Sequence, residues 1–313
     1  MTRPSLVAVV GATATGKSAV ALALAEAFDG EIVNADAYQL YRGLDIGTAK
    51  VDAAGRARVP HHLIDVADPD TPLTLASYLD LATEALHDVW SRTRLPILTG
   101  GSGQYVWALI EGWQPPRVPP DLALRAELEA YASEHGDAAL HARLAALDPE
   151  AASKLDAQNR RRVVRALEVV TRTGRSLAAC QARTPIDADV LVLGLRAGRE
   201  TLYARLDART DAMFAAGFVD EVRHLREQGY ADAFAVRGGI GYKEVSQQLD
   251  GEIDLDEAVR RMKNANHRLV RRQNAWFKPT DPRICWLDAD ADASERSCEV
   301  VDAWLRGQNE AGR

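Results

Sequence analysis

The 313-residue sequence contains only three cysteines, at positions 180, 285 and 298, and no C-x-x-C pair. We interpret them as free thiols in a reducing cytoplasm, which excludes a disulfide-stabilised fold and a structural zinc site. Apolar runs long enough to cross a membrane are also lacking, so we expect no membrane contact. The first residues lead directly into a predicted strand, and no cleaved signal peptide is expected. We expect a cytoplasmic monomer.

Acidic residues are scarce in two stretches of an otherwise acidic chain, whose net charge is −7. Residues 260–278 contain seven Lys or Arg and no acid, and residues 160–175 contain six Arg and a single Glu. The net charge argues against a general nucleic-acid binder, but two local basic stretches favour contact with a polyanion. The alternative is that both are solvated helix faces.

The first 112 residues alternate between predicted strands and predicted helices. Apolar runs predict strands at 5–10, 31–36 and 95–101. Helical spacing of apolar residues predicts helices at 17–28, 75–93 and 102–112. This alternation predicts an α/β fold in which helices flank both faces of a parallel sheet.

A proline-rich break at residues 113–121 ends this pattern, and no further strand is predicted before residue 189. The intervening residues have helical spacing throughout. We therefore predict a core of residues 1–113 and 186–313 with an all-helical insertion of residues 114–185. Later core elements are expected at helices 200–216, 219–228 and 256–278 and at an edge strand 283–289.

Residues 11–18, GATATGKS, match the P-loop pattern between a predicted strand and a predicted helix. In such a loop, backbone N–H groups at a helix N-terminus converge on phosphate oxygens. Lys17 is then placed to reach the terminal phosphates, and the Ser18 hydroxyl to ligate Mg²⁺. The predicted diphosphate-binding residues are Gly11, Ala12, Thr13, Ala14, Thr15, Gly16, Lys17 and Ser18. The loop suits a nucleoside triphosphate or another diphosphate.

A carboxylate is lacking where P-loop ATPases hold the metal shell, because the strand at 95–101 ends in Thr99 and glycines. Asp36 instead ends the strand at 31–36, at the edge of the sheet where ligands bind in such folds. We interpret Asp36 as a metal ligand or as a general base beside the phosphate. The third interpretation is an aspartate that caps a turn.

Three further polar residues each have two interpretations. Ser102 begins a helix after a glycine pair, where it either caps the helix or directs its hydroxyl into the same cleft. Arg205 and Arg209 share one helix face, where they either form surface ion pairs or reach the phosphates. The glycine-rich stretch 237–244, RGGIGYKE, leads into a helix and by itself indicates only a turn.

Eight sequence blocks occur in the order seen in bacterial tRNA dimethylallyltransferases. They are GATATGKSAVALALA, NADAYQLYRGLDIGTAK, PHHLIDV, TGGSGQYVWALIEG, NRRRVVRALEV, RTDAMFAAGFVDEVRHL, GGIGYKE and RRQNAWFK. The chain resembles this family, and the second block together with a P-loop is highly specific to it. The resemblance implies a P-loop NTPase-like fold and transfer of a dimethylallyl group from its diphosphate to N6 of adenosine 37 in tRNA, beside the anticodon.

The resemblance also implies catalytic roles for three residues. Lys17, with Mg²⁺, would neutralise the diphosphate leaving group. Asp36 matches the family's catalytic aspartate, which would accept the proton of the adenine amine. Ser102 stands where the family usually has Thr and keeps a hydroxyl near the diphosphate. Arg209 matches an arginine that clamps the phosphates from the opposite wall.

Contacts with the anticodon stem-loop follow from the same resemblance, with the target base flipped out of its stack. The predicted tRNA-binding residues are Asp36, Ala37, Tyr38, Gln39, Arg161, Arg162, Arg165, Gly241, Tyr242, Lys243, Arg268, Arg271 and Arg272. Two residues depart from the family pattern. Ala37 replaces a Ser of many members, which is expected to weaken one contact with the flipped base, and Ala12 replaces a Pro in the P-loop.

Three alternative functions remain. A related transferase that prenylates free AMP, ADP or ATP needs the same P-loop but no grip on RNA, and the arginines of the helical insertion argue against it. A small-molecule kinase would place ATP on this loop. A non-enzymatic RNA-binding module would leave the intact P-loop unexplained.

Overall fold

The computed structural model describes residues 3–177, 183–233 and 238–311. Cys180, predicted to be a free thiol, and Arg237, from the glycine-rich stretch, lie outside the described residues. The chain divides into two compact units. The first contains Met1–Ile110 and Asp187–Arg313, and the second contains Glu111–Ile186. The sequence placed the corresponding breaks at 113/114 and 185/186.

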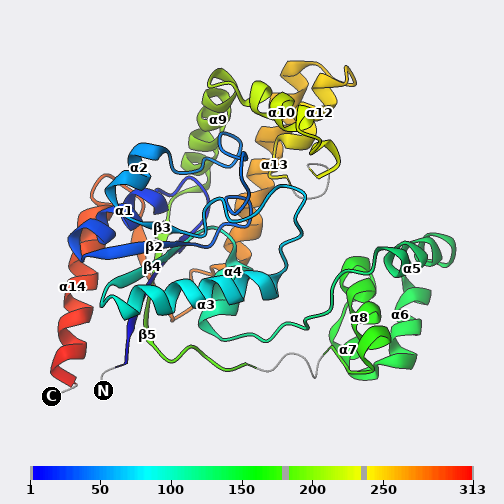
Figure 1. The fold of residues 1–313 in the computed structure, drawn as a ribbon, viewed down its shortest axis with the longest axis horizontal. Coiled ribbons are helices and arrows are strands. Elements are labelled where there is room, and N and C mark those ends of the chain that lie inside the picture. Colours follow the sequence, from blue (N-terminus) through cyan, green and yellow to red (C-terminus); the bar gives the residue numbers. More distant parts are fainter. Residues whose placement is uncertain (1–2, 178–182, 234–237, 312–313) are drawn as a thin grey trace. The chain divides into compact units, whose positions relative to one another are not determined.

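A single parallel sheet forms the centre of the first unit (Figure 1). Its order is β3-β2-β4-β1-β5-β6. The strands are β1 (Ser5–Gly11), β2 (Gly30–Asn34), β3 (His61–His62), β4 (Leu95–Thr99), β5 (Asp189–Arg196) and β6 (Ile284–Asp288). Strand β1 lies in the middle, where every residue from Leu6 to Val10 is fully buried. The predicted parallel α/β fold and the late edge strand are confirmed, whereas the two-residue β3 was not predicted.

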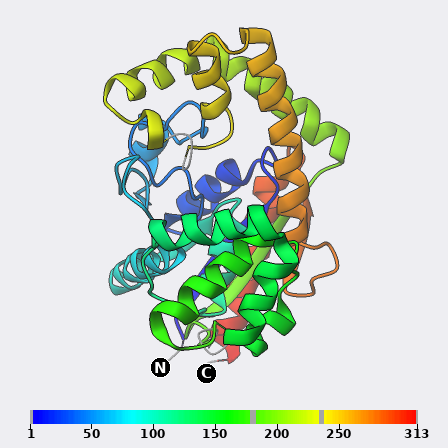
Figure 2. The same ribbon diagram turned by 90° about the vertical axis from the view of Figure 1, so that its right-hand side faces the viewer.

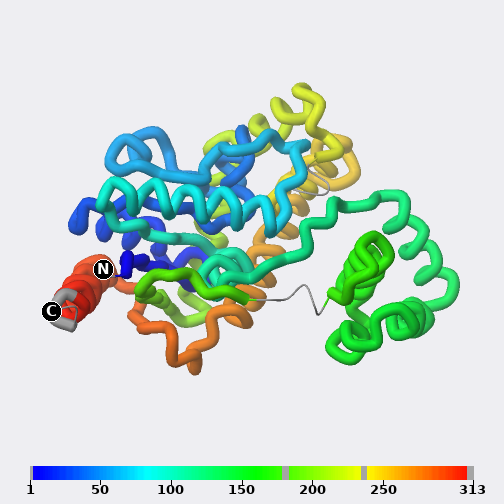
Figure 3. The backbone as a smooth tube through the Cα atoms, turned by 60° about the horizontal axis from the view of Figure 1, so that its bottom comes forward, coloured from blue at the N-terminus to red at the C-terminus, as the bar shows by residue number. Residues whose placement is uncertain are grey.

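Helices cover both faces of the sheet (Figures 1 and 3). Helices α1 (Lys17–Ala27) and α14 (Ala293–Ala311) pack on one face, where Leu24 and Val301 join Val7 of β1 in one apolar cluster. Successive side chains of a strand point to opposite faces, so the other residues of β1 need a second cover. Helices α3 (Leu75–Ser91) and α4 (Gly103–Ile110) provide this second cover. Helix α2 (Ala53–Arg58) lies beside α1, where Arg58 pairs with Glu26.

Outside residues 231–237, several helices extend the first unit beyond the carboxyl ends of the strands (Figure 1). They are α9 (Arg199–Ala215), α10 (Phe218–Glu227), α12 (Tyr242–Leu249) and α13 (Leu255–Trp276). The buried residues of α13 recur every three or four positions, which gives the helix one inward face. Met262, Asn266 and Gln273 lie on that face, and the arginines of the same helix therefore point away from it.

The second unit is built from helices α5 (Leu122–His135), α6 (Asp137–Leu147), α7 (Pro149–Lys154) and α8 (Arg160–Thr173), drawn in green in Figure 2. Leu128, Leu140 and Leu167 form its small apolar core. Side chains of Asp148 and Asn159 accept hydrogen bonds from the first turns of α7 and α8, as helix N-caps do. All four predicted helices of the insertion are present.

Across the part of the chain that the structure describes, no helix has both the length and the apolar character that crossing a bilayer requires.

Candidate active site

The P-loop connects the end of β1 to the start of α1. Gly11 has a φ of 138°, and a Cβ at this position would lie 2.4 Å from the carbonyl oxygen of Leu195, so only glycine fits. Gly16 caps α1 with a φ of 87° and leaves the first turn without a side-chain cap. Thr15 closes the loop internally, since its hydroxyl donates to the carbonyl of Ala12 at 2.8 Å. The first N–H groups of α1 are therefore open to an anion.

Three charged residues predicted for the site come together around this loop. Lys17 donates to the carbonyl of Ala12 at 2.7 Å, and Arg209 from α9 donates to the Thr13 hydroxyl at 2.9 Å. Burial lowers the pKa of Lys17 to about 8, while the negative charge of Asp36 acts in the opposite direction. Burial likewise lowers the pKa of Arg209. Such buried cations favour an anionic ligand.

Arg209 also carries an unsatisfied donor. Its Nε is buried and has no hydrogen-bond partner among the described residues. A buried donor without a partner costs free energy, about 1–3 kcal/mol for a typical group. A phosphate oxygen at this position would remove that cost, as expected for an arginine that clamps a diphosphate.

Asp36 lies in a tight turn directly after β2. The side chain of Asn34 shapes this turn, because it accepts from the Asp36 N–H at 3.0 Å and donates to the Asp36 carbonyl at 3.1 Å. The Asp36 carboxylate accepts from the Tyr38 N–H at 2.9 Å. Burial raises the pKa of Asp36, and the Tyr38 N–H and the charge of Lys17 oppose that rise. Asp36 is thus both a turn residue and a desolvated carboxylate with a raised pKa.

Ser102 links this turn to the end of β4. Its hydroxyl accepts from the Ala37 N–H at 3.1 Å, and its own N–H donates to the Ala35 carbonyl at 3.2 Å. The side chain therefore does not cap α4, although its carbonyl accepts the first N–H groups of that helix. Gly100 permits the close approach of the two strand ends, because a Cβ there would lie 2.2 Å from the backbone of Ala35.

Arg205 forms no ion pair with the described acids, and its guanidinium contacts the backbone. It donates to the backbone carbonyls of Ala14 and Ala289, at 3.4 and 3.3 Å. The nearby acids have other partners, since Asp207 contacts His267 and Asp211 pairs with Lys263. Arg205 thus supports the P-loop backbone from outside.

Two of the residues predicted to contact tRNA are buried in the first unit. Tyr242 is fully buried, donates its hydroxyl to Glu221 at 2.7 Å and meets Phe218 edge to face. A direct contact of the Tyr242 side chain with RNA is therefore wrong for this structure. Gly241 is buried against Met262, where a Cβ would lie 2.6 Å from the sulfur. Lys243, the third residue of this stretch, is exposed.

Tyr38 and Gln39 follow Asp36 at the surface. Tyr38 is 39 % exposed. Gln39 is half-buried, and its amide donates to the carbonyls of Thr48 and Ala49. Tyr38 thus presents part of its side chain at the surface, whereas the Gln39 amide holds its own loop.

Glu221, which no sequence motif indicated, anchors the loop after Tyr38. Its carboxylate accepts from the backbone N–H groups of Asp45, Ile46 and Gly47, at 3.1, 2.6 and 3.2 Å, besides the Tyr242 hydroxyl. The only signal was the glycine-containing block DIGTAK, which needs an outside acceptor for its N–H groups. Glu221 supplies that acceptor from α10.

The basic stretch on α13 divides into paired and unpaired residues. Arg260 and Arg261 pair with Glu257. Arg268 and Arg272 are exposed and form no ion pair with any described residue. Arg271 is exposed too, and it donates to the Tyr203 hydroxyl at 3.4 Å. The last two turns of α13 thus carry the charge available to a polyanion.

The arginines of α8 divide in the same way. Arg161 and Arg162 are exposed and pair with none of the described acids. Arg165 is half-buried, pairs with Glu168 and donates to the carbonyl of Val118 at 3.1 Å. The predicted contact of Arg165 with RNA is not supported, because its guanidinium is committed to the interior of the second unit.

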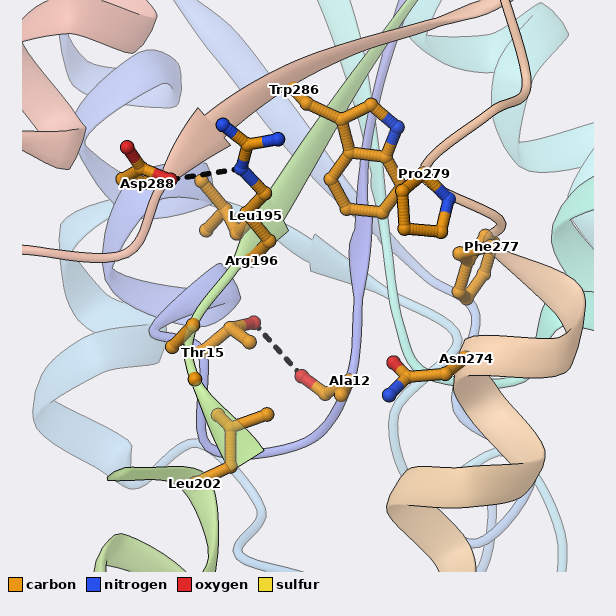
Figure 4. A pocket seen from close by; sticks show the side chains of 12 residues that line it. Ala12, Thr15, Leu195, Arg196, Leu202, Asn274, Phe277, Pro279, Trp286 and Asp288 are labelled. Atoms are coloured by element: carbon orange, nitrogen blue, oxygen red, sulfur yellow. Dashed lines mark hydrogen bonds and ion pairs between the residues drawn. The ribbon is translucent and has the colours of Figure 1, made fainter. Parts of the chain in front are cut away.

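A cavity of about 420 Å³ lies behind the P-loop. Figure 4 shows Trp286, Pro279 and Phe277 among its lining residues, together with Ala12 and Thr15 of the P-loop. Its lining residues are Ala12, Thr15, Leu195, Arg196, Ala197, Gly198, Leu202, Asn274, Phe277, Pro279, Trp286 and Asp288. This set lacks Lys17, Asp36 and Arg209, but it includes Ala12, whose carbonyl accepts from Lys17.

Comparisons with known proteins agree on one family. A family model described as IPP transferase matches residues 39–280. A tRNA dimethylallyltransferase of Roseiflexus sp. is 48% identical over 301 residues, which cover 96% of this chain and 98% of the relative. A tRNA dimethylallyltransferase of Dehalococcoides mccartyi is 44% identical over 300 residues, with coverages of 96% and 92%.

Two solved structures resemble the chain over nearly its whole length. A tRNA isopentenylpyrophosphate transferase of Bacillus halodurans is 38% identical, has a TM-score of 0.72 and is matched over 99% of this chain and 98% of its own. A eukaryotic dimethylallyltransferase acting on tRNA is 26% identical, has a TM-score of 0.80 and is matched over 97% and 80%. Because the family model and these relatives cover most of the chain, the protein belongs to the IPP transferase family.

Proposed function

We propose that the protein transfers a dimethylallyl group from dimethylallyl diphosphate to N6 of adenosine 37 in tRNA, beside the anticodon. The observation that carries the proposal is the cluster of Lys17, Arg209 and Asp36 around an open P-loop. Two cations and a helix N-terminus suit a diphosphate, and a carboxylate beside them suits a proton transfer.

The reaction breaks the bond between the allylic carbon and the diphosphate oxygen and forms a bond from that carbon to N6. Negative charge develops on the departing diphosphate, where Lys17 and Arg209 stabilise it. The Nε donor of Arg209, which has no partner among the described residues, offers one further hydrogen bond to that oxygen cluster. Held on the P-loop, the donor presents its carbon to an amine bound beside Asp36.

Asp36 takes the proton that N6 loses. The adenine amine is a weak nucleophile because its lone pair is delocalised into the ring, so a base that accepts the proton as the new bond forms lowers the barrier. Burial raises the pKa of Asp36, which brings its basicity closer to that needed at neutral pH. The turn built by Asn34 and Ser102 fixes the direction of the carboxylate.

Mg²⁺ is part of the proposal. Among the described residues no group of three or more His, Cys, Asp or Glu could hold a metal ion. Mg²⁺ commonly binds through one or two protein oxygens together with substrate phosphates and water, which fits the exposed Ser18 hydroxyl at the start of α1. When bound, the ion would neutralise charge on the diphosphate.

For tRNA binding we propose the exposed arginines of two helices and the ring of Tyr38. Arg268 and Arg272 on α13, and Arg161 and Arg162 on α8, are suited to phosphate contacts. Tyr38, two residues from the proposed base, is suited to stack on the flipped adenine or its neighbour. Grip on RNA by separate local patches is compatible with a net charge of −7.

The test incubates the protein with dimethylallyl diphosphate, Mg²⁺ and tRNA, followed by mass spectrometry of the digested nucleosides. Prenylated adenosine is expected, and it should vanish when a tRNA with guanosine at position 37 is used. Parallel reactions contain AMP, ADP or ATP as the acceptor, and labelled ATP with tRNA but no prenyl donor. Prenylation of the free nucleotides but not of tRNA, or phosphoryl transfer from ATP, would replace the proposed function with one of its alternatives.

A further inference from the structure

A buried glutamine on α13 joins two loops of the site. The Oε1 atom of Gln273 accepts from the Thr13 N–H in the P-loop at 2.8 Å. Its Nε2 atom donates to the carbonyl of Gly101, directly after β4, at 3.1 Å. Gln273 is only 5% exposed, so neither bond is readily replaced by water. The two contacts lie 260 and 172 residues away in sequence.

The geometry requires a primary amide at this position. One end of the side chain must accept and the other must donate, which Glu, Met and Leu cannot do. Gly101 makes room for this amide, because a Cβ there would lie 2.2 Å from Nε2 of Gln273. The residue is therefore fitted to both loops and is not a generic filler of the core.

Each of the two loops carries part of the proposed chemistry. Thr13 lies in the diphosphate cradle, and its hydroxyl accepts from Arg209. Gly101 directly precedes Ser102, whose hydroxyl holds the turn that contains Asp36. Two hydrogen bonds of Gln273, the covalent step from Gly101 to Ser102 and the hydrogen bond from Ala37 to Ser102 thus connect the P-loop to the Asp36 turn.

We propose that Gln273 is a positioning residue, which sets the separation between the diphosphate cradle and Asp36. This inference rests on the proposed prenyl transfer. Displacement at the allylic carbon needs the leaving group, the carbon and the amine in line, and an error of about 1 Å in such an arrangement can slow a reaction about 100-fold. The P-loop alone holds the leaving group, and Gln273 sets the position of the P-loop relative to Asp36.

The helix that provides Gln273 adds to this role. Arg272 is its exposed neighbour in sequence, and Arg268 lies just over one turn earlier. The proposed grip on RNA and the link between the two loops therefore share one continuous 22-residue helix. Because this helix is one continuous element, it would fix the position of the bound RNA relative to the two loops.

The test compares Gln273→Met and Gln273→Glu with the unaltered protein in single-turnover reactions at saturating tRNA and prenyl donor. Gln273→Met removes both hydrogen bonds at similar volume, and we expect the rate to fall about 10- to 100-fold. Donor affinity should stay within about threefold, because the P-loop N–H groups and Lys17 remain. Gln273→Glu keeps the acceptor for Thr13 but sets a carboxylate against the Gly101 carbonyl, and it should be slow as well.

Asn266→Leu is the matched control. Asn266 lies on the same helix, is also 5% exposed and donates to Thr210 of α9 at 3.1 Å, not to either loop. This variant should lose thermal stability to a similar degree while its single-turnover rate stays within about threefold of the original. A comparable loss of rate in Asn266→Leu would reduce Gln273 to a residue that merely docks α13.

A double-mutant cycle with Asp36→Asn separates positioning from general damage. If Gln273 acts by aligning Asp36, then Gln273→Met should change the residual rate of Asp36→Asn by no more than about threefold. An equal loss in both backgrounds, or no loss in either, would overturn the inference. The unaltered protein in the same assay reports on the proposed function: without any transfer both proposals fail, whereas normal transfer with an unaffected Gln273→Met removes only the positioning role.

Discussion

The hydroxyl of Ser102 accepts a hydrogen bond of 3.1 Å from the N–H of Ala37, the residue after Asp36. This contact joins two strand ends that are neighbours in the sheet but 65 residues apart in sequence. Through this contact Ser102 stabilises the turn that contains Asp36, a role distinct from capping α4 and from contacting the diphosphate. The hydroxyl holds the backbone of the turn that aims the proposed base.

Replacing Ser102 tests this contact. Ser102→Ala leaves the Ala37 N–H without its acceptor, and we expect the single-turnover rate to fall about tenfold, equivalent to about 1.4 kcal/mol, a typical value for one hydrogen bond. Ser102→Thr keeps the hydroxyl and should retain most of the rate. Equal rates in the alanine and threonine variants would show that the hydroxyl does not matter.

The lowered pKa of Lys17 predicts that binding of the prenyl donor depends on pH. Because its pKa is lowered to about 8, the side chain is charged below that pH and neutral above it. Affinity for dimethylallyl diphosphate should therefore fall as the pH rises through about 8, measured by calorimetry between pH 7 and 9.5. The guanidinium of Lys17→Arg stays charged over this range, so its binding curve should be flat. A decline of the same size in Lys17→Arg would assign the titration to another group.

Much of this architecture could be predicted from the sequence because its signals are local. The strands and helices around the P-loop follow from apolar spacing within single segments, and so do the four helices of the insertion. The prolines at residues 115–120 mark the change from one pattern to the other. Asp36 could be placed at the ligand edge because it directly follows a buried strand.

The contacts that shape the site could not be predicted, because they join distant parts of the chain. Glu221 holds a loop about 175 residues earlier, and Gln273 bonds to residue 13. The burial of Tyr242 could not be predicted for the same reason. A glycine-rich turn before an aromatic residue suggests a ligand loop, but here the buried ring packs against Phe218 of α10 and its hydroxyl donates to Glu221.

The exposed end of α13 predicts a change in salt dependence. Arg272→Ala should weaken tRNA binding and make the slope of log K against log salt shallower by about 0.7, the value for one phosphate contact on a single strand. Arg260→Ala is the matched control, since Arg260 lies on the same helix but pairs with Glu257. Binding is measured by filter retention across a salt series. Identical slopes for both variants would show that this face of α13 is solvated surface that does not contact the tRNA.

The role of Asp36 as the proton acceptor is the centre of the proposed mechanism. Asp36→Asn keeps the shape of the side chain and its place in the turn but removes the basic oxygen. We expect tRNA and the prenyl donor to bind normally while the chemical step slows about 100-fold or more, the usual contribution of a general base. In the unaltered protein the rate should fall at low pH with a midpoint above the ordinary aspartate pKa, since burial raises it.

The most direct measurement is therefore the single-turnover rate of Asp36→Asn at saturating substrates, taken at low and at high Mg²⁺. A general base predicts a rate that is slow at both concentrations, with unchanged donor affinity. Partial recovery of the rate at high Mg²⁺, together with weakened donor binding at low Mg²⁺, would make Asp36 a metal ligand. A rate close to that of the unaltered protein at any Mg²⁺ concentration would contradict its part in the mechanism.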